Sequence, residues 1–213
     1  MATPMGLLVA GFNYEAVAED EFNDWYDTEH IPERQRIKGF LCTQRWLGHE
    51  DPKVSIATYD LENLGVLYSP PYAAIARENS SPWSKRMIGK CRRICRFEAE
   101  QILPGNQRSP ENAEGMLLFA MNVAPEAEME FNAWYDTEHI PRVSAVPGCL
   151  SARRFRSREG THRYIALYHL ASPEIPSSKA WEEAAVTPWA LKIGPFTSDR
   201  LRIVLRKYRR AGA

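Results

Sequence analysis

The sequence lacks any long hydrophobic run and any excess of charge of one sign. No apolar stretch approaches the ~18 residues that a membrane-spanning helix needs. Lys and Arg number 27, as do Asp and Glu, so the overall charge predicts neither a nucleic-acid nor a membrane partner. Residues 1–10 contain no basic segment of the kind that opens a secretory signal, and we therefore expect a cytoplasmic protein.

Cysteine is scarce, and several familiar catalytic and metal-binding motifs are missing. The four cysteines form no CxxC pair and no Cys/His cluster with zinc spacing, so we expect core thiols and no metal site. There is also no Gly-rich phosphate loop, no GxSxG elbow and no HExxH sequence. Nucleotide-binding, serine-hydrolase and zinc-protease functions therefore have no local support.

The chain contains an internal repeat. Residues 21–32 are EFNDWYDTEHIP and residues 130–141 are EFNAWYDTEHIP, with eleven of twelve positions identical at an offset of 109. Copies of about 105 residues are too long for solenoid units and suit small domains. We predict one domain at residues 1–103 and a second at 115–213, joined by a linker at 104–114 that is rich in Pro, Gly, Asn and Ser.

Each copy predicts the element order β-α-β-β-α-β, a ferredoxin-like split βαβ unit. Hydrophobic periodicity places the elements of the first copy at residues 6–12, 19–31, 40–48, 54–61, 63–79 and 90–102. Those of the second copy fall at residues 115–123, 127–140, 149–158, 162–170, 177–193 and 199–208. We predict an α+β protein in which helices cover one face of each antiparallel sheet and the two sheets pack face to face.

The repeated motif has a helical period, and its apolar side carries titratable groups. On a helical wheel one apolar arc, with His30 at its edge, holds Phe22, Trp25, Tyr26 and Glu29. Asp27 and Thr28 fall on the opposite side, where we expect solvated surface. The second copy presents the same arc through Phe131, Trp134, Tyr135, Glu138 and His139.

Each copy thus offers one carboxylate and one imidazole near a helix end. The helix should end or kink at Ile31, because Pro32 restricts the residue before it. An ionised Glu29 on an aromatic arc is costly unless it is paired, and His30 titrates near neutral pH. The two could act as general acid and base. In a structural alternative, Glu29 accepts backbone N–H bonds from a neighbouring loop and His30 binds a carbonyl at the helix end.

The pattern F-x-x-W-Y-D-x-E-H-I-P, followed after several residues by Gly, resembles the dimeric α/β-barrel superfamily, and within it the EthD-type families. The resemblance covers essentially the whole chain, twice. In these families two chains usually pair their sheets into one barrel. The resemblance therefore implies tandem βαββαβ repeats fused into one barrel, with a pseudo-two-fold axis that relates His30 to His139.

The resemblance also implies a site between helix and sheet, where several of these enzymes place a His and a Tyr. It implies a catalytic role for His30 and His139, with Tyr26 and Tyr135 for positioning or protonation, and the helical spacing adds Glu29 and Glu138, which would orient the imidazoles or relay protons. The implied ligand-binding residues are Trp25, Trp134, Tyr59 and Tyr168, although core packing suits the tryptophans as well. Because Asp60 in one copy corresponds to His169 in the other, the two cavities are expected to differ.

Three functions fit these observations. The favoured one is a cofactor-independent isomerase, cyclase or lyase, or a monooxygenase, acting on a small aromatic or lactone-like metabolite. A histidine would abstract a proton beside a carbonyl while a tyrosine stabilises the enolate oxygen. The alternatives are a non-catalytic small-ligand-binding or stress-related barrel, and haem binding through one of the five histidines. We expect no cofactor, a small-molecule partner and, as a further option, a homodimer of fused barrels.

Overall fold

The computed structural model describes residues 3–210, in which eight strands form one closed antiparallel barrel. Those of the first half are β1 (Gly6–Asn13), β2 (Phe40–Gly48), β3 (Val54–Leu61) and β4 (Arg92–Leu103). Those of the second half are β5 (Gly115–Val123), β6 (Cys149–Glu159), β7 (Tyr164–Leu170) and β8 (Thr197–Lys207). Their order around the barrel is β1-β3-β2-β8-β5-β7-β6-β4. The predicted α+β architecture of two fused βαββαβ halves is confirmed.

The two sheets join along both edges. Strand β4 pairs with β6, where Gln101 lies opposite Phe155, and β2 pairs with β8, where Trp46 lies opposite Lys207. The halves therefore share backbone hydrogen bonds in addition to packed side chains. The β2–β8 seam runs only from Trp46 to Gly48 on β2, whereas the β4–β6 seam runs from Glu98 to Leu103 on β4.

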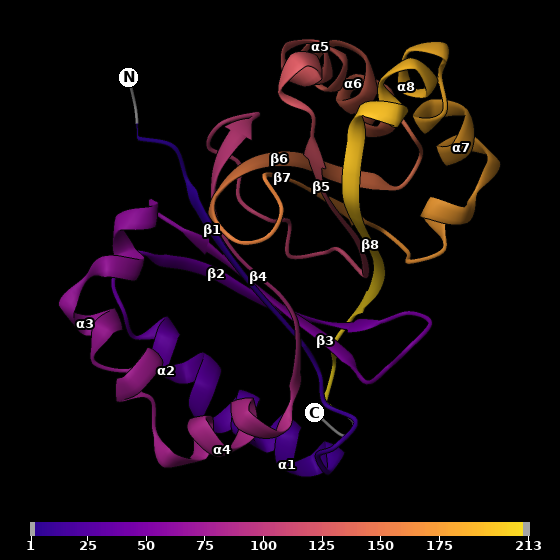
Figure 1. Ribbon diagram of the computed structural model, residues 1–213. Coiled ribbons are helices and arrows are strands. Elements are labelled where there is room, and N and C mark those ends of the chain that lie inside the picture. The colour runs from indigo at the N-terminus through magenta and orange to yellow at the C-terminus, as the bar shows by residue number, and fades with distance from the viewer. Residues whose placement is uncertain (1–2, 211–213) are drawn as a thin grey trace.

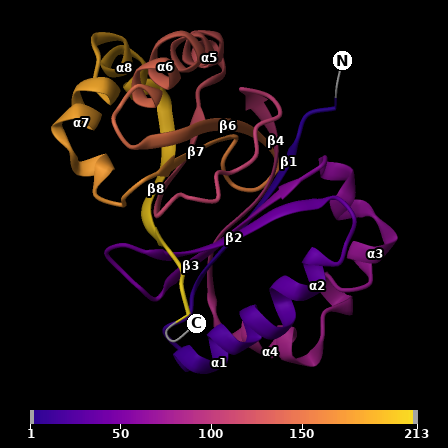
Figure 2. The same ribbon diagram turned by 180° about the vertical axis from the view of Figure 1, so that it is seen from behind.

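The helices cover the outside of the barrel, and each half carries its own set (Figure 1). In the first half these are α1 (Glu19–Asp24), α2 (Ile31–Gln35), α3 (Pro70–Ala73) and α4 (Pro82–Lys90). In the second half they are α5 (Glu128–Trp134), α6 (Ile140–Ser144), α7 (Lys179–Ala185) and α8 (Pro188–Ile193). The view from behind shows the same separation of the two helical layers (Figure 2). No helix within residues 3–210 is long and apolar enough to cross a membrane.

The motif helix was predicted to end or kink at Ile31; it does not end there, but its regular hydrogen bonding is interrupted just before that residue. A π-helical turn over Trp25–His30 joins α1 to α2, and the Ile31 N–H donates to the carbonyl of Tyr26, five residues earlier. Pro32 then occupies the first turn of α2, directly after the π-helical turn. The widened turn takes up the strain that a proline imposes on a regular helix. The second half repeats this turn over Tyr135–His139.

The helical segment predicted at residues 63–79 was also wrong in its bounds. The structure has short 3₁₀ turns at Leu64–Tyr68 and Arg77–Asn79 around α3, and it places the longer helix α4 afterwards. Ser81 caps α4 by accepting from the backbone N–H of Ser84 at 2.9 Å. A Ser followed by Pro is a helix-start signal, and the prediction overlooked it.

A glycine follows the motif in both halves because the chain turns sharply into the next strand. Gly39 has φ +100° and Gly148 has φ +86°, a backbone region that favours glycine. A Cβ atom would lie 2.5 Å from the side chain of Val66 at Gly39 and 2.5 Å from that of Ile175 at Gly148. The glycine that accompanies the sequence pattern is therefore a requirement of the fold.

Strand alternation divides the apolar residues into three layers. Side chains such as Leu7 and Val9 point into the barrel, where residues of both halves form one core. Their neighbour Leu8 points the other way, toward the helices of the first half. A third cluster, around Leu117, lies under the helices of the second half. A ligand site between helix and sheet therefore lies outside the barrel core.

The barrel core also contains a buried ion pair between the halves. Arg153 Nη1 donates to Asp60 Oδ1 at 2.9 Å, and their side chains are 0% and 1% exposed. Ser109, in the segment that connects β4 to β5, donates to Asp60 Oδ2 through its backbone N–H at 2.6 Å and its hydroxyl at 2.7 Å. His169, the repeat equivalent of Asp60, packs instead against the Trp46 ring. The sequence difference at this position thus lies inside the barrel.

Three buried histidines predict a loss of stability in acid. Burial lowers the pKa of His30 and His169 well below the usual value and lowers that of His139 to about 4. An unfolded histidine has a pKa near 6.5, so below this pH the unfolded state binds more protons than the folded state. The free energy of unfolding should therefore be highest above about pH 6.5, where histidine is neutral in both states. It should decrease as the pH falls toward 4, because the unfolded state is then favoured by protonation of its histidines. For His139 alone this decrease amounts to about 3 kcal/mol.

Urea unfolding measured in steps from pH 8 to pH 4 tests this expectation. The midpoint should be constant above about pH 7 and should then fall. The variant His139→Gln should flatten the fall. A midpoint that does not change between pH 7 and pH 4 would contradict the assignment of neutral buried imidazoles.

Candidate functional site

The polar side of the motif holds a buried arginine in each half. Arg45 reaches from β2 to 4.5 Å from the centre of the Tyr26 ring, and its guanidinium binds Asn23 and, at 3.2 Å, Asp27. In the second half Arg154 lies 4.2 Å from the Tyr135 ring and binds Asn132 and Asp136. The prediction that Asp27 is solvated surface was wrong, because its carboxylate neutralises an arginine contributed by the sheet.

The motif glutamates bind the start of the next outer helix. Glu29 Oε1 accepts hydrogen bonds from Ser81 Oγ, the cap of α4, and from Ser84 Oγ at 3.0 Å. Glu138 accepts from Thr187 Oγ1, the cap of α8. Within residues 3–210 neither carboxylate is hydrogen-bonded to the adjacent histidine. The expected Glu–His pair is thus not formed, and these contacts favour the structural alternative in a modified form, with side-chain hydroxyls as the donors.

The motif tryptophans are buried, and their indole N–H groups differ between the halves. Trp25 Nε1 donates to Ser84 Oγ at 2.9 Å, whereas Trp134 Nε1 is buried and has no hydrogen-bond partner in the described part of the chain. The difference arises because Ala190 occupies the position that corresponds to Ser84. Both tryptophans pack in the helix–sheet cores.

Replacing Ala190 by Ser should therefore stabilise the protein. The new hydroxyl can accept from Trp134 Nε1 as Ser84 does from Trp25, which we expect to raise the free energy of unfolding by about 1 kcal/mol. Urea unfolding measures the change. The matched variant Ser84→Ala should lower the free energy of unfolding, and a destabilised Ala190→Ser variant would contradict the expectation.

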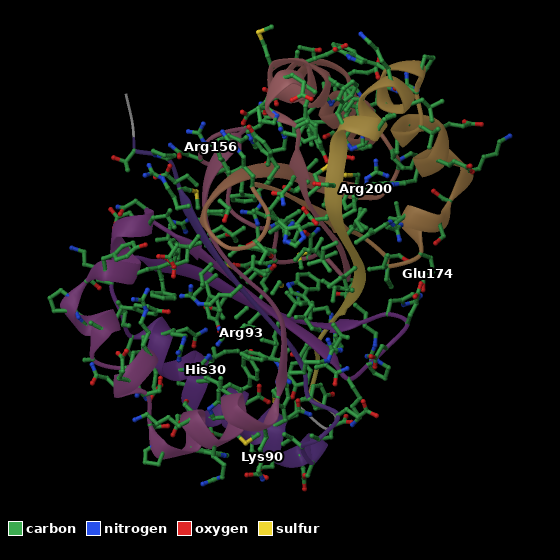
Figure 3. All side chains as sticks on the ribbon, viewed as in Figure 1. His30, Lys90, Arg93, Arg156, Glu174 and Arg200 are labelled. Carbon is green, nitrogen blue, oxygen red and sulfur yellow. The ribbon has the colours of Figure 1, made fainter. Side chains whose placement is uncertain are left out.

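A cavity of about 620 Å³ lies between the sheet and the helices of the first half. His30 and Tyr59 line it, the first from the π-helical turn and the second from β3. Further side chains of the wall include Leu8, Ala10, Phe12, Arg34, Tyr72, Arg77, Lys85, Ile88, Arg93, Arg96 and Glu159. Figure 3 shows His30 and Arg93 on the side of the barrel that carries α1–α4.

His30 and Tyr59 both have unused hydrogen-bonding capacity. His30 is 5% exposed, and among residues 3–210 neither its Nδ1 nor the Tyr59 hydroxyl has a hydrogen-bond partner. Burial, reinforced by Arg34 and Arg45, keeps the pKa of His30 well below its usual value, so the imidazole is neutral at pH 7. Burial raises the pKa of Tyr59 to about 12. The cavity thus combines an imidazole that can accept a proton with a phenol that can donate a hydrogen bond.

The equivalent histidine and tyrosine of the second half contact each other. His139 Nε2 lies 3.0 Å from the hydroxyl of Tyr168, and the Trp181 ring packs against that tyrosine at 5.3 Å. Larger side chains stand at two positions that line the cavity of the first half: Trp181 corresponds to Tyr72, and Phe119 corresponds to Ala10. The expectation that the two sites differ is therefore supported by their packing.

The structure brings only part of the predicted site together. His30 and Tyr59 line the cavity, whereas Trp25, Tyr26 and Glu29 do not. Tyr26 is fully buried in a cluster of aromatic rings. The prediction missed Arg34, which the repeat could have indicated, because the second copy has Val143 at that position inside an otherwise similar segment.

Comparison with known proteins supports the fold. No family model and no curated protein matches the sequence. A Fusobacterium nucleatum protein named as a presumed monooxygenase is similar in structure, with a TM-score of 0.68 and 12% identity over 98% of this chain and 94% of that one. An anthrone oxidase-like protein has a TM-score of 0.65 and 9% identity over 99% and 94% of the two chains.

The chlorite dismutase from Candidatus Nitrospira defluvii has a TM-score of 0.55 and 9% identity over 98% of this chain and 93% of that one. At these identities the likeness shows the fold alone. The protein has the fold of the dimeric α/β-barrel superfamily. Both halves of the barrel are contributed by one polypeptide.

Proposed function

We propose that the first half is a cofactor-independent enzyme site for a small aromatic or lactone-like metabolite, and that His30 is its general base. The observation that carries this proposal is that a neutral His30 and a Tyr59 whose hydroxyl has no hydrogen-bond partner among residues 3–210 both line one cavity of about 620 Å³. The volume lies within the range of about 300–1,000 Å³ that is usual for small-molecule sites. An affiliation with the EthD-type families belongs to the same proposal.

Each proposed step follows from these two side chains. An unprotonated nitrogen of His30 takes a proton from the carbon beside a carbonyl of the ligand, and the C–H electron pair forms the enolate. The Tyr59 hydroxyl donates a hydrogen bond to the enolate oxygen. His30 then returns the proton to the same or a neighbouring carbon, which gives exchange or isomerisation. The low pKa of His30 makes the imidazolium costly in the empty cavity, and the negative enolate beside it offsets that cost.

We assign a structural role to the second half. Its His139 Nε2 and Tyr168 hydroxyl already bind each other, and Trp181 and Phe119 fill the adjoining positions. In the alternative function, a non-catalytic binding protein, the same cavity would hold a ligand without turnover.

Proton exchange separates the two functions without knowledge of the final product. The protein is incubated in D₂O with a panel of lactones and aromatic ketones, and proton NMR follows loss of the signals beside the carbonyl. Faster exchange with at least one compound supports the enzyme. Binding without faster exchange across the panel would support the binding protein, and a Soret band in the absorbance of the purified protein would support haem binding.

A further inference from the structure

The wall of the cavity carries an excess of positive charge. Five cationic side chains face a single carboxylate, that of Glu159, and these cations are Arg34, Arg77, Lys85, Arg93 and Arg96. Glu98 lies near two of them, since its carboxylate contacts Arg96 and lies 4.0 Å from Arg77. Within residues 3–210 Lys85 and Arg93 have no ion-pair partner. The nearby carboxylates are therefore too few to neutralise the positive charge of the cavity wall.

Arg34 is the one cation that is buried in this wall. Its side chain is 6% exposed, and its Nη1 donates to the carbonyl of His30 at 2.7 Å. Its only carboxylate within 4 Å in the described chain is Glu33, at 3.5 Å and 23% exposed. The bond to His30 fixes the guanidinium beside the proposed base. A guanidinium has five N–H donors, and most of those of Arg34 are left for a ligand.

The second half shows that the fold does not require these cations. Val143 stands in place of Arg34 and Leu191 in place of Lys85, although the flanking motif is kept. The fold therefore accepts apolar side chains at these two positions in the second half, where they do not line a comparable cavity. This difference between the halves argues that Arg34 and Lys85 serve the cavity and not the helix packing.

The remaining wall is apolar and aromatic. It includes Leu8, Ala10, Phe12, Tyr72 and Ile88. We infer that the cavity selects a ligand with a carboxylate head and an apolar or aromatic body, and that Arg34 binds the carboxylate. The planar fork of a guanidinium matches two carboxylate oxygens, which a neutral amide cannot reproduce. This inference rests on the proposed function because it names the substrate class of the same site.

A matched pair of probes tests the inference. Isothermal titration calorimetry compares 2-naphthoate with its neutral analogue 2-naphthamide. The unmodified protein should bind the carboxylate at least about 10-fold more tightly. In Arg34→Gln, affinity for naphthoate should fall by about 10- to 100-fold, while naphthamide changes less than about twofold. Equal binding of both probes by the unmodified protein, or absence of binding by either, would overturn the inference.

Two further variants keep the test decisive. Lys85→Leu introduces the residue of the second half at an exposed position and should weaken naphthoate binding alone. Thermal unfolding of Arg34→Gln shows whether the bond to His30 has a separate structural role. His30→Gln should keep the preference for the carboxylate.

The two proposals can fail separately. If the unmodified protein catalyses no proton exchange but still prefers naphthoate to naphthamide, only the proposed function is wrong. If it catalyses exchange but binds the two probes equally, only this inference is wrong.

Discussion

Replacing His30 by Gln is expected to lower proton exchange beside the ligand carbonyl by about 10²–10⁴-fold, the usual contribution of a positioned general base. Glutamine is similar in size and keeps hydrogen-bonding groups, but its side-chain amide does not take up a proton near neutral pH. The rate is measured by NMR in D₂O with a compound that the unmodified protein exchanges. Ligand affinity should change far less than the rate, because His30 acts in the chemical step.

His139→Gln is the matched control for this experiment. The two histidines lie within the same eight-residue sequence WYDTEHIP in both copies, so any general effect of the substitution on the motif helix should appear in both variants. We expect the exchange rate of His139→Gln to stay within about twofold of the unmodified protein under conditions where both are folded. Equal losses in the two variants would show that the motif histidines act through the fold and not through the cavity.

Replacing Asp60 by Ala is expected to destabilise the protein by about 3–5 kcal/mol, because removal of one partner leaves a buried charge uncompensated. Arg153 would then keep the carbonyl of Gln107, at 3.0 Å, as its hydrogen-bond partner, and Ser109 would lose both of its bonds to Asp60. Urea unfolding followed by far-UV circular dichroism measures the loss.

A double variant distinguishes the cost of a lone charge from the value of the ion pair. Asp60→Leu combined with Arg153→Leu removes both charges, and its stability should lie closer to that of the unmodified protein than the stability of Asp60→Ala does. Asp60→Asn preserves an acceptor for Ser109, so its stability should lie between that of Asp60→Ala and that of the double variant. A loss of less than about 1 kcal/mol in Asp60→Ala would show that the barrel core readily rehydrates Arg153.

Much of the fold could be predicted because its signals are local or repeated. Alternation of apolar residues predicted each strand to within a few residues, and the duplicated motif predicted two equivalent halves. The helix wheel also placed Phe22, Trp25 and Tyr26 correctly in the core. The clear error was the single helix predicted at residues 63–79, where short 3₁₀ turns flank α3 and the longer helix α4 begins only at Pro82.

The site was less predictable because its contacts span distant parts of the chain. The partner of Glu29 is Ser81, which lies 52 residues away and is delivered by the cap of another helix. The partner of Asp27 is Arg45, which the sheet places under the helix. No spacing rule within the motif specifies such partners. Glu29 therefore looked available for catalysis, and Asp27 looked like solvated surface, until the tertiary structure showed both carboxylates bound.

By itself the sequence determined the duplication, the α+β class, the strands and the aromatic face of the motif helix, because these follow from periodicity and identity between the copies. Only the tertiary structure decided that the sheets close through β4–β6 and β2–β8, and that the cavity belongs to the first half. Nearly identical motifs face different walls, with Ala10 and Tyr72 in one half and Phe119 and Trp181 in the other. The physical reason is that a cavity is the space that side chains from separate elements leave unfilled, and this depends on how the elements pack against one another.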